Sequence, residues 1–337
     1  MTYPAWGAMI LVLIATVLLP TRTVSAIALY PFLISLVFLG LPHGAWDHRV
    51  IAAARGTTLS WHHLTIVCAA YTLMVGLYGA LWLAAPPLAF VLFIVQSWLH
   101  WGQGDAAYLQ SRYATRTGPP QWLTWIVRGG APILLPIFRF PEEFARIAGG
   151  VTGLFTPQRA GTWLLPPSLC GSGLFLLTVS VVAYLILVVR SPGRADPASR
   201  VVAVEDVAEV SLLYTVFAVA NPVLAVGIYF CCWHGLRHIA RLLLLEESSR
   251  VLCATGRVAA AGVCFGWQCL PILLAALGML WGAYLWAVRT GASDGTTTAL
   301  SVYLAMIACL TFPHFLLVCW LDHVQSQDRC EQKETGG

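Results

Sequence analysis

The sequence predicts an all-α membrane protein, a bundle of about eight to ten transmembrane helices. Hydrophobic residues make up 58% of the 337 residues and charged residues only 10%, whereas about 25% of the residues in a typical globular domain are charged. Mean hydropathy is +0.76. Apolar runs of about 20 residues, the length that crosses a bilayer as a helix, recur along the chain. We therefore expect the protein to lie within the lipid bilayer.

The apolar runs follow one another over nearly the whole length. They lie near residues 5–20, 25–42, 63–85, 87–104, 121–138, 168–189, 208–233, 258–288 and 298–321. No early run has the features of a cleaved signal peptide, so we expect the first to be retained as a helix. Because no repeat or long linker divides the chain, we expect one multi-pass membrane domain over residues 1–324 and a charged, disordered tail over residues 325–337.

Proline and glycine interrupt two of the runs. The segments "RGGAPILLPIF" and "FAVANPVLAVG" are predicted to be kinked or broken, at places where neighbouring elements satisfy the freed backbone groups. The polar stretch "SPGRADPASRVVAVED", residues 191–206, is predicted to be a surface loop. The amphipathic piece "PEEFARIAGG" is predicted to lie at the membrane interface.

The charged residues indicate topology. Nearly all 19 basic residues are arginines, and they gather in "RYATR", "RSPGRADPASR" and "RHIARLLLLEESSR", which the positive-inside rule makes cytoplasmic. We therefore expect a multi-pass protein of the cell (plasma) membrane and no nucleic-acid partner. Ten cysteines are scattered without a CxxC pair. We therefore expect the cysteines to be small buried hydrophobic residues, and we expect neither a disulfide framework nor a zinc-thiolate site.

Histidines in the apolar runs are the strongest functional signal. Five of the nine histidines lie in or at the ends of these runs: His43, His100, His234, His238 and His314. Strongly polar groups at membrane depth are costly and mark functional sites. In "CCWHGLRHIA", His234 and His238 are four residues apart, so a helix would place both on one face, about 5–6 Å apart. Two such imidazoles can chelate a metal ion, although an isolated pair also fits one core and one interfacial histidine.

Other runs supply further candidate ligands. His100 ends the run in "QSWLHWGQGD", and His43 follows a proline in "LPHGAWDHRV". His43 and His48 are five residues apart and diverge by about 140° on a helix, so we select the deeper His43 as the ligand. His314, in "TFPHFLL", is open to three interpretations: a fifth ligand, an outer donor, or a satisfied histidine behind a proline. We favour the last two.

Acidic and aromatic residues lie close to these histidines in sequence. Asp47 and Asp105 are candidates to accept a hydrogen bond from a ligand's other ring nitrogen, but they also fit an interfacial ion pair or a helix cap. The flanking aromatic residues are Trp46, Trp98, Trp101, Tyr229 and Trp233. An apolar, aromatic-lined site inside a membrane favours a lipid-soluble substrate, although aromatic residues are also ordinary in cores and interfacial belts.

The type of ligand limits which metal ions can bind and which reactions they can support. Four neutral imidazoles suit iron, copper or zinc. A hydrolytic zinc site would need a carboxylate base and ready water, whereas redox-active iron with open positions can bring dioxygen to an unsaturated hydrocarbon. The sequence therefore favours oxygen chemistry.

Four motifs, "GLPHGAWDH", "HWGQGD", "WHGLRH" and "PHFLLV", together resemble the Brp/Blh family of membrane β-carotene 15,15′-dioxygenases over about residues 36–321. The resemblance implies an enzyme whose catalytic domain cleaves β-carotene, or a related carotenoid, with dioxygen at the central double bond to give two all-trans-retinals. It implies non-haem Fe(2+) on His43, His100, His234 and His238, with no catalytic residue beyond the metal centre. The oxygenated intermediate, a dioxetane or an epoxide, is left open, as is delivery of the retinal to a rhodopsin.

Departures from the family pattern lie beside these histidines. Trp46 stands where a smaller aliphatic residue is usual, and Trp101 and Gln103 stand where phenylalanine and often an acid are expected. These departures concern the choice of carotenoid more than the type of reaction.

Competing functions make different demands on the sequence. A membrane di-iron hydroxylase or desaturase would need about eight histidines in boxes such as HxxHH, which are absent. A rhodopsin needs a membrane lysine for its Schiff base, and the only lysine is Lys333 in the tail. A histidine-rich membrane electron-transfer or transport protein would show a haem absorption band or transport without oxygen uptake.

Overall fold

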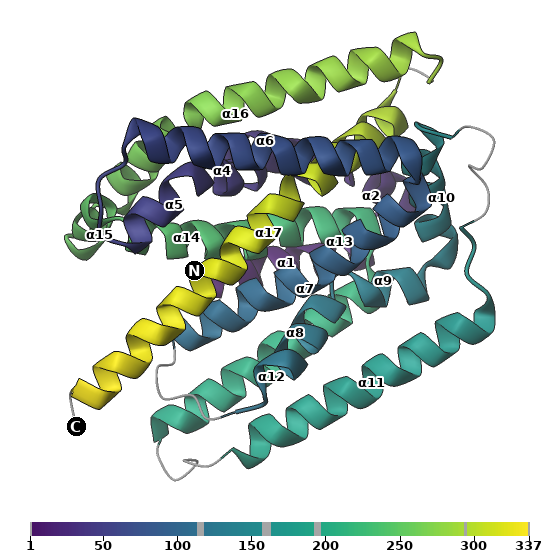
Figure 1. Cartoon of the computed structure of the whole chain (residues 1–337). Helices are drawn as coiled ribbons and strands as arrows, with labels where there is room; N and C mark the ends of the chain where they lie inside the picture. The colour runs from purple at the N-terminus through teal and green to yellow at the C-terminus, as the bar shows by residue number, and fades with distance from the viewer. Residues whose placement is uncertain (1, 113–117, 157–162, 192–196, 293–294, 336–337) are drawn as a thin grey trace.

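The computed structural model describes residues 2–112, 118–156, 163–191, 197–292 and 295–335, and every regular element in these ranges is helical (Figure 1). The all-α prediction is confirmed. The first half contains α1 (Thr2–Leu18), α2 (Thr21–Ile27), α3 (Tyr30–Phe38), α4 (Gly40–Ala45), α5 (Asp47–Ala54), α6 (Trp61–Ala84), α7 (Pro86–Arg112), α8 (Gln121–Gly130), α9 (Leu134–Arg139) and α10 (Pro141–Gly153). The second half contains α11 (Pro167–Arg190), α12 (Pro197–Val219), α13 (Pro222–Ile228), η2 (Tyr229–Gly235), α14 (Leu236–Leu245), α15 (Glu247–Ala254), α16 (Val258–Arg289) and α17 (Thr296–Thr335).

In the described part of the chain six helical stretches are long and apolar enough to cross a bilayer, which indicates a multi-pass membrane protein. They are Thr21–Ala54, Trp61–Ala84, Pro167–Arg190, Pro222–Leu245, Val258–Arg289 and Thr296–Gln327, and the shorter apolar helix Tyr3–Leu18 accompanies them. Large apolar side chains point outward from these helices, for example Trp267 and Trp281 of α16, which are 70% and 63% exposed. Figure 1 shows α16 and α11 at opposite edges of the bundle. Such apolar outer faces suit contact with lipid.

The two proline- and glycine-containing runs are broken, as predicted. The run near residues 121–138 is divided into α8 and α9 around "GGAP", and the run near 208–233 is divided into α12, α13 and η2. At the second break Pro222 opens α13, and the side chain of Asn221 accepts a hydrogen bond from the Leu224 amide at 3.1 Å. Proline cannot donate to a preceding helical turn, so the chain ends one helix and caps the next.

The prediction of a surface loop over residues 191–206 is wrong for its second half. Helix α12 begins at Pro197, and residues 192–196 lie outside the described residues. Asp206 is buried and its carboxylate lies 2.5 Å from the Arg128 guanidinium. A buried counter-ion on α8 therefore compensates the acid, and sequence polarity alone gives no sign of this pairing.

Two other segments form helices. The amphipathic piece forms α10, which buries Ala148 and Val151, and its placement at the membrane interface is still a prediction. Helix α17 continues through residues 325–335, part of the segment that the sequence separates as a tail. The division of the chain at residue 324 is likewise still a prediction.

Helices α7 and α8 cross at backbone contact. A Cβ atom on Gly102 would lie 2.1 Å from the Trp125 carbonyl oxygen, and one on Gly129 would lie 2.0 Å from the Trp98 carbonyl oxygen. Only glycine permits this approach. The crossing fixes the position of α7 at Gly102, which lies two residues after His100.

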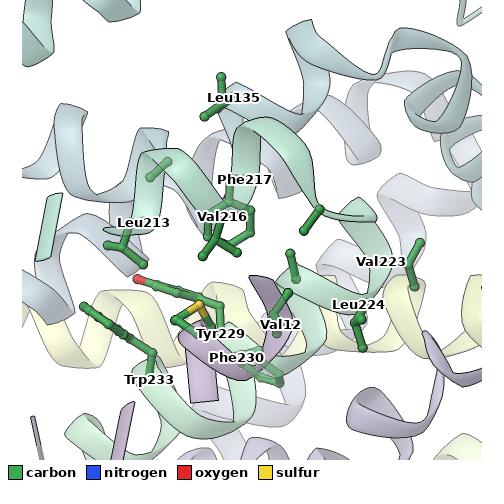
Figure 2. Packing of buried hydrophobic residues seen from close by; sticks show 14 of the residues in the cluster. Val12, Leu135, Leu213, Val216, Phe217, Val223, Leu224, Tyr229, Phe230 and Trp233 are labelled. Atoms are coloured by element: carbon green, nitrogen blue, oxygen red, sulfur yellow. The ribbon is translucent and has the colours of Figure 1, made fainter. Parts of the chain in front are cut away.

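The largest apolar cluster surrounds the segment that carries His234. Figure 2 shows Tyr229, Phe230 and Trp233 of η2 packed with Leu213 and Phe217 of α12, and with Val12 of α1. Tyr229 and Trp233 are fully buried. Because large aromatic residues contribute much of the energy of core packing, this cluster anchors η2 against the bundle.

Candidate metal centre

Five histidines from five different elements meet in the interior of the bundle. His43 lies on α4, His100 on α7, His234 on η2, His238 on α14 and His314 on α17. Each is between 1% and 6% exposed. The four histidines that the sequence selects as ligands are therefore brought together, and the fifth candidate lies with them.

Three of the predicted ligands form a compact group. The ligand atoms of His43, His100 and His234 all lie within 4.8 Å of one another. The ring centroids of His43 and His234 are 5.5 Å apart, and those of His100 and His234 are 5.0 Å apart. Three buried imidazoles at this separation can share one transition-metal ion.

His238, the fourth predicted ligand, reaches the same cluster from α14. Its ring centroid lies 5.3 Å from that of His43 and 6.4 Å from that of His100. The rings of His234 and His238 are stacked, 6.3 Å apart with an interplanar angle of 13°. They therefore share a face as the spacing predicts, but η2 is a π-helix, a local widening that often occurs at functional sites. The four-residue spacing predicts a regular α-helix at this point, and the structure differs in this respect.

The ring nitrogens of the cluster fit a metal ion. Five buried ring nitrogens of the cluster have no hydrogen-bond partner among the described residues: His100 Nδ1 and Nε2, His234 Nε2, His238 Nε2 and His314 Nε2. Unpartnered buried polar atoms are costly, and neutral imidazole nitrogens suit iron, copper or zinc. On the side away from the group, His43 Nδ1 lies 3.2 Å from the Leu39 carbonyl oxygen, a contact that leaves Nε2 as its ligand atom.

Asp47 hydrogen-bonds to a histidine, but the partner is His314. The Asp47 carboxylate is buried and accepts hydrogen bonds through Oδ2 from the Tyr71 hydroxyl and from His314 Nδ1, the latter at 2.7 Å. A carboxylate in this position orients a metal-binding histidine and raises its basicity. Tyr71 was not anticipated, because its position 24 residues after Asp47 carries no sequence signal.

Asp105 has no histidine partner. Its carboxylate lies 2.8 Å from Arg128 and 2.7 Å from Arg237, and it accepts a hydrogen bond from Trp233 Nε1 at 2.9 Å. The predicted contact with a ligand is therefore not seen among the described residues, and Asp105 forms ion pairs that are buried instead of interfacial. Asp105 thereby orients Trp233 of η2 and Arg237 of α14, the residues that precede His234 and His238 in the chain.

The ion pairs of Asp105 belong to a larger buried network. Glu209 of α12 also binds Arg128, at 2.7 Å, and Arg237. The guanidinium of Arg237 is sandwiched between the Tyr108 and Trp233 rings, 4.1 Å from each centroid. Because several of these groups come from α7, α8, α12 and α14, the network ties the elements behind the histidines together. Arg128 and Glu209 lie in no recognisable motif, so the sequence carries no signal of their role.

An apolar cavity opens beside the histidine cluster. Its volume is about 240 Å³. His43, His100, His234 and His314 line it, and its wall continues along α9, α10, α13, α16 and α17, for example at Phe140, Phe144, Val223, Ile272 and Ile307. The described lining contains no lysine or arginine. The wall therefore suits a long, neutral, apolar ligand and offers nothing to a phosphate or carboxylate group.

Four of the five aromatic residues singled out in the sequence have different positions relative to the cavity. Trp101 lines the cavity, stacks on Phe230 with ring centroids 5.7 Å apart and lies 5.6 Å from the His234 ring. Trp46 instead donates a hydrogen bond to Gln268 at 2.7 Å and is not part of the cavity wall. Tyr229 and Trp233 lie behind the wall, in the core cluster of Figure 2.

Comparisons with known proteins show which family the chain belongs to. The family model for beta-carotene 15,15′-dioxygenase matches residues 34–322. The probable beta-carotene 15,15′-dioxygenase Blh of Halobacterium salinarum is 35% identical over 309 residues, which is 88% of this chain and 84% of the relative. The probable beta-carotene 15,15′-dioxygenase Brp of the same organism is 27% identical over 316 residues, 87% of this chain and 83% of the relative.

A more distant relative is the beta-carotene 15,15′-dioxygenase of an uncultured marine bacterium, which is 22% identical over 289 residues, 84% of this chain and 90% of the relative. No solved structure shows significant similarity to the chain. The family match covers all five clustered histidines, and the Blh relative shares more than a third of the aligned residues. The chain belongs to the β-carotene 15,15′-dioxygenase family and is an enzyme of that family.

Proposed function

We propose that this enzyme cleaves β-carotene, or a closely related carotenoid, with dioxygen at the central 15,15′ double bond, giving two molecules of all-trans-retinal. We place the reaction at Fe(2+) held by His43, His100, His234 and His238. The observation that carries the proposal is the buried histidine cluster in the wall of an apolar cavity. Membership of the family and the names of the relatives support the choice of substrate.

The cavity supports a hydrocarbon substrate. Phe140, Phe144 and Ile307 extend the apolar wall away from the histidines, and burial of an extended polyene there gains about 25 cal/mol per Å² of apolar surface removed from water. Trp101 and Phe230 form a stacked aromatic wall beside His234. Flat π-faces of this kind can hold a conjugated chain in one orientation, and orientation determines which double bond meets the oxidant.

The reaction balances without a proton donor or acceptor. One carbon–carbon double bond is broken, two carbonyl bonds form, and both atoms of one dioxygen molecule enter the two aldehydes. Bound iron would supply the activation of dioxygen. The protein's task is then to hold the metal with neutral imidazoles, exclude water and orient the polyene, which fits a wall whose polar side chains are few beyond the histidines and the Asp47–Tyr71 pair.

The alternative of a di-iron hydroxylase or desaturase receives no support. In the described part of the chain a single group of histidine, cysteine or acidic side chains has ligand atoms close enough to hold a metal. The nearest acids hydrogen-bond instead to His314 and Tyr71 or to arginines. Among the described residues a second metal would lack ligands.

We further propose that the enzyme lies in the cell membrane and releases retinal into the bilayer, where a retinal-binding protein such as a rhodopsin can take it up. The exposed apolar side chains of the long helices support residence in lipid. Both substrate and product are apolar, so neither needs to leave the membrane.

The proposal is tested by expressing the chain in cells that accumulate β-carotene and measuring retinal in extracts. Separate His→Ala variants at His43, His100, His234 and His238 should reach the membrane but yield no retinal, while His323→Ala on the exposed end of α17 should behave like the parent. A parent that accumulates in the membrane while β-carotene persists and retinal is absent would overturn the assignment of this substrate.

A further inference from the structure

His314 is the one member of the histidine cluster that the four-ligand assignment does not use. It lies on α17 directly after Pro313, a helix-interior proline, and is 4% exposed. Its ring faces the other histidines: the centroids of His43, His100 and His238 lie 5.0, 4.8 and 5.1 Å from that of His314. These separations are shorter than several of those among the four assigned histidines.

The separations match imidazoles bound to one ion. At a metal–nitrogen distance of about 2.1 Å, two rings at right angles have centroids about 4.6 Å apart, and two rings on opposite sides have centroids about 6.5 Å apart. All three separations of His314 lie between these limits, near the right-angle value. The His314 ring therefore lies beside three of the assigned histidines at the ring separation of a neighbouring ligand, while the ligand atoms within 4.8 Å of one another are those of His43, His100 and His234.

The hydrogen bond to Asp47 determines which ring nitrogen of His314 carries the proton and which carries the lone pair. A carboxylate oxygen that already accepts from Tyr71 also accepts from His314 Nδ1, so Nδ1 carries the proton. In a neutral imidazole the other nitrogen then holds a lone pair. That nitrogen, Nε2, is buried without a partner among the described residues. A lone pair directed into the cluster can bind a cation but cannot donate a hydrogen bond.

This arrangement decides among the three interpretations of His314. A satisfied core histidine would have partners on both nitrogens, and an outer donor would present an N–H to the site. Instead the chain Tyr71–Asp47–His314 has the form of a carboxylate that orients a metal-binding histidine, with the hydroxyl of Tyr71 holding the carboxylate in turn. The preference for the last two interpretations in the sequence analysis is therefore replaced by the first.

We infer that His314 is a fifth histidine ligand of the metal, with Asp47 and Tyr71 as positioning residues. The inference rests on the proposed metal centre and deepens it. Five imidazoles would leave a six-coordinate ion with a single exchangeable position. They would also draw the ligand set from five elements, so that α17 is tied to α4 and α7 by the metal.

The test uses the full-length protein purified in detergent, freed of metal with a chelator and loaded with Co(2+), whose visible absorption bands report its ligands. We would compare the parent with His314→Ala, with His314→Gln, and with His323→Ala on the same helix as the matched control. Metal affinity is measured by competition with a chromophoric chelator. Thermal unfolding and size-exclusion profiles identify any variant that does not fold, and the milder Gln variant serves if Ala fails.

The inference predicts that both His314 variants shift the Co(2+) bands and weaken binding by at least about 100-fold, beyond the range of 10–100-fold expected for an outer residue. Free imidazole should restore the parent bands in His314→Ala, while His323→Ala should match the parent. Bands that are unchanged in folded, Co(2+)-loaded His314 variants would overturn the fifth-ligand assignment and leave the proposed function intact. A folded parent that binds neither Co(2+) nor Fe(2+) would overturn the proposed function itself.

Discussion

His314 Nδ1 lies 2.7 Å from Asp47 Oδ2, joining helix α17 to the start of α5, 267 residues away in the chain. The same carboxylate oxygen accepts the hydroxyl proton of Tyr71 on α6. Three helices are thus held together beside the histidine cluster. Asp47 and Tyr71 can therefore be substituted without removing a histidine, so their effect on metal binding can be measured separately from that of the ligands.

Removal of the Tyr71 hydroxyl should weaken metal binding without abolishing it. Tyr71→Phe deletes one of the two donors to Asp47, so the carboxylate orients His314 less firmly, and we expect metal affinity to fall about 10-fold, the lower end for outer-group losses. Tyr30→Phe, at a residue that is 59% exposed, should leave affinity unchanged. Equal affinities for Tyr71→Phe and the parent, measured by chelator competition, would show that this hydrogen bond does not support the site.

The stacked wall beside His234 should govern use of the substrate. Trp101→Ala removes the ring that stacks on Phe230, and we expect kcat/KM for β-carotene to fall at least about 10-fold, corresponding to about 1.4 kcal/mol, with some cleavage away from the central bond. The matched control is Trp281→Ala, because Trp281 lies on α16 and is 63% exposed. Chromatography of the aldehyde products measures both effects. An unchanged rate and product pattern would remove Trp101 from the substrate wall.

The buried ion network should carry far more stability than a surface pair. Arg128 is fully buried and binds Asp105, Asp206 and Glu209. Arg128→Met therefore leaves Asp105 and Glu209 to Arg237 and removes the guanidinium that binds Asp206. We expect a loss of about 3–5 kcal/mol in the free energy of unfolding. Arg250→Met breaks the exposed pair with Glu247 and should cost at most about 1 kcal/mol. Denaturant titration in detergent compares the two variants, and similar losses would contradict the structural role of the network.

The close crossing of α7 and α8 should not tolerate a methyl group. Gly102→Ala places a Cβ atom 2.1 Å from the Trp125 carbonyl oxygen, so the helices must separate, at a cost of about 1–3 kcal/mol. His100 should move with α7 and metal occupancy should fall. Gly76→Ala on α6 has no atom within 4 Å of the new Cβ and should be neutral or stabilising by up to about 1 kcal/mol. Metal content per folded chain and the unfolding midpoint check both variants.

Much of this architecture is predictable from the sequence because membrane helices are encoded locally. The breaks before Pro222 and at "GGAP" follow from single residues. The histidines stand out because polar groups are rare at membrane depth, and His234 and His238 share a face in the structure as their spacing implies. Local signals of this kind do not depend on which helices become neighbours.

The remaining features depend on contacts between distant segments. The burial of Asp206 requires Arg128 from another helix, so a charged stretch that resembles a loop became the start of α12. Asp105 binds arginines instead of a histidine, and Trp46 turns toward Gln268 instead of the cavity. The contact of His314 with Asp47 spans almost the whole chain. None of these pairings leaves a pattern in the local sequence.

The central claim, that this histidine cluster holds the iron that cleaves β-carotene, is tested most directly by metal titration. Metal-free enzyme in detergent is mixed with increasing Fe(2+) under argon, then given β-carotene and air, and retinal is measured against bound iron. The account predicts no retinal without iron, a linear rise that ends at one iron per chain, two retinals for each β-carotene consumed, and neither iron retention nor retinal for His100→Ala. Full activity of the metal-free enzyme, or of His100→Ala, would contradict it.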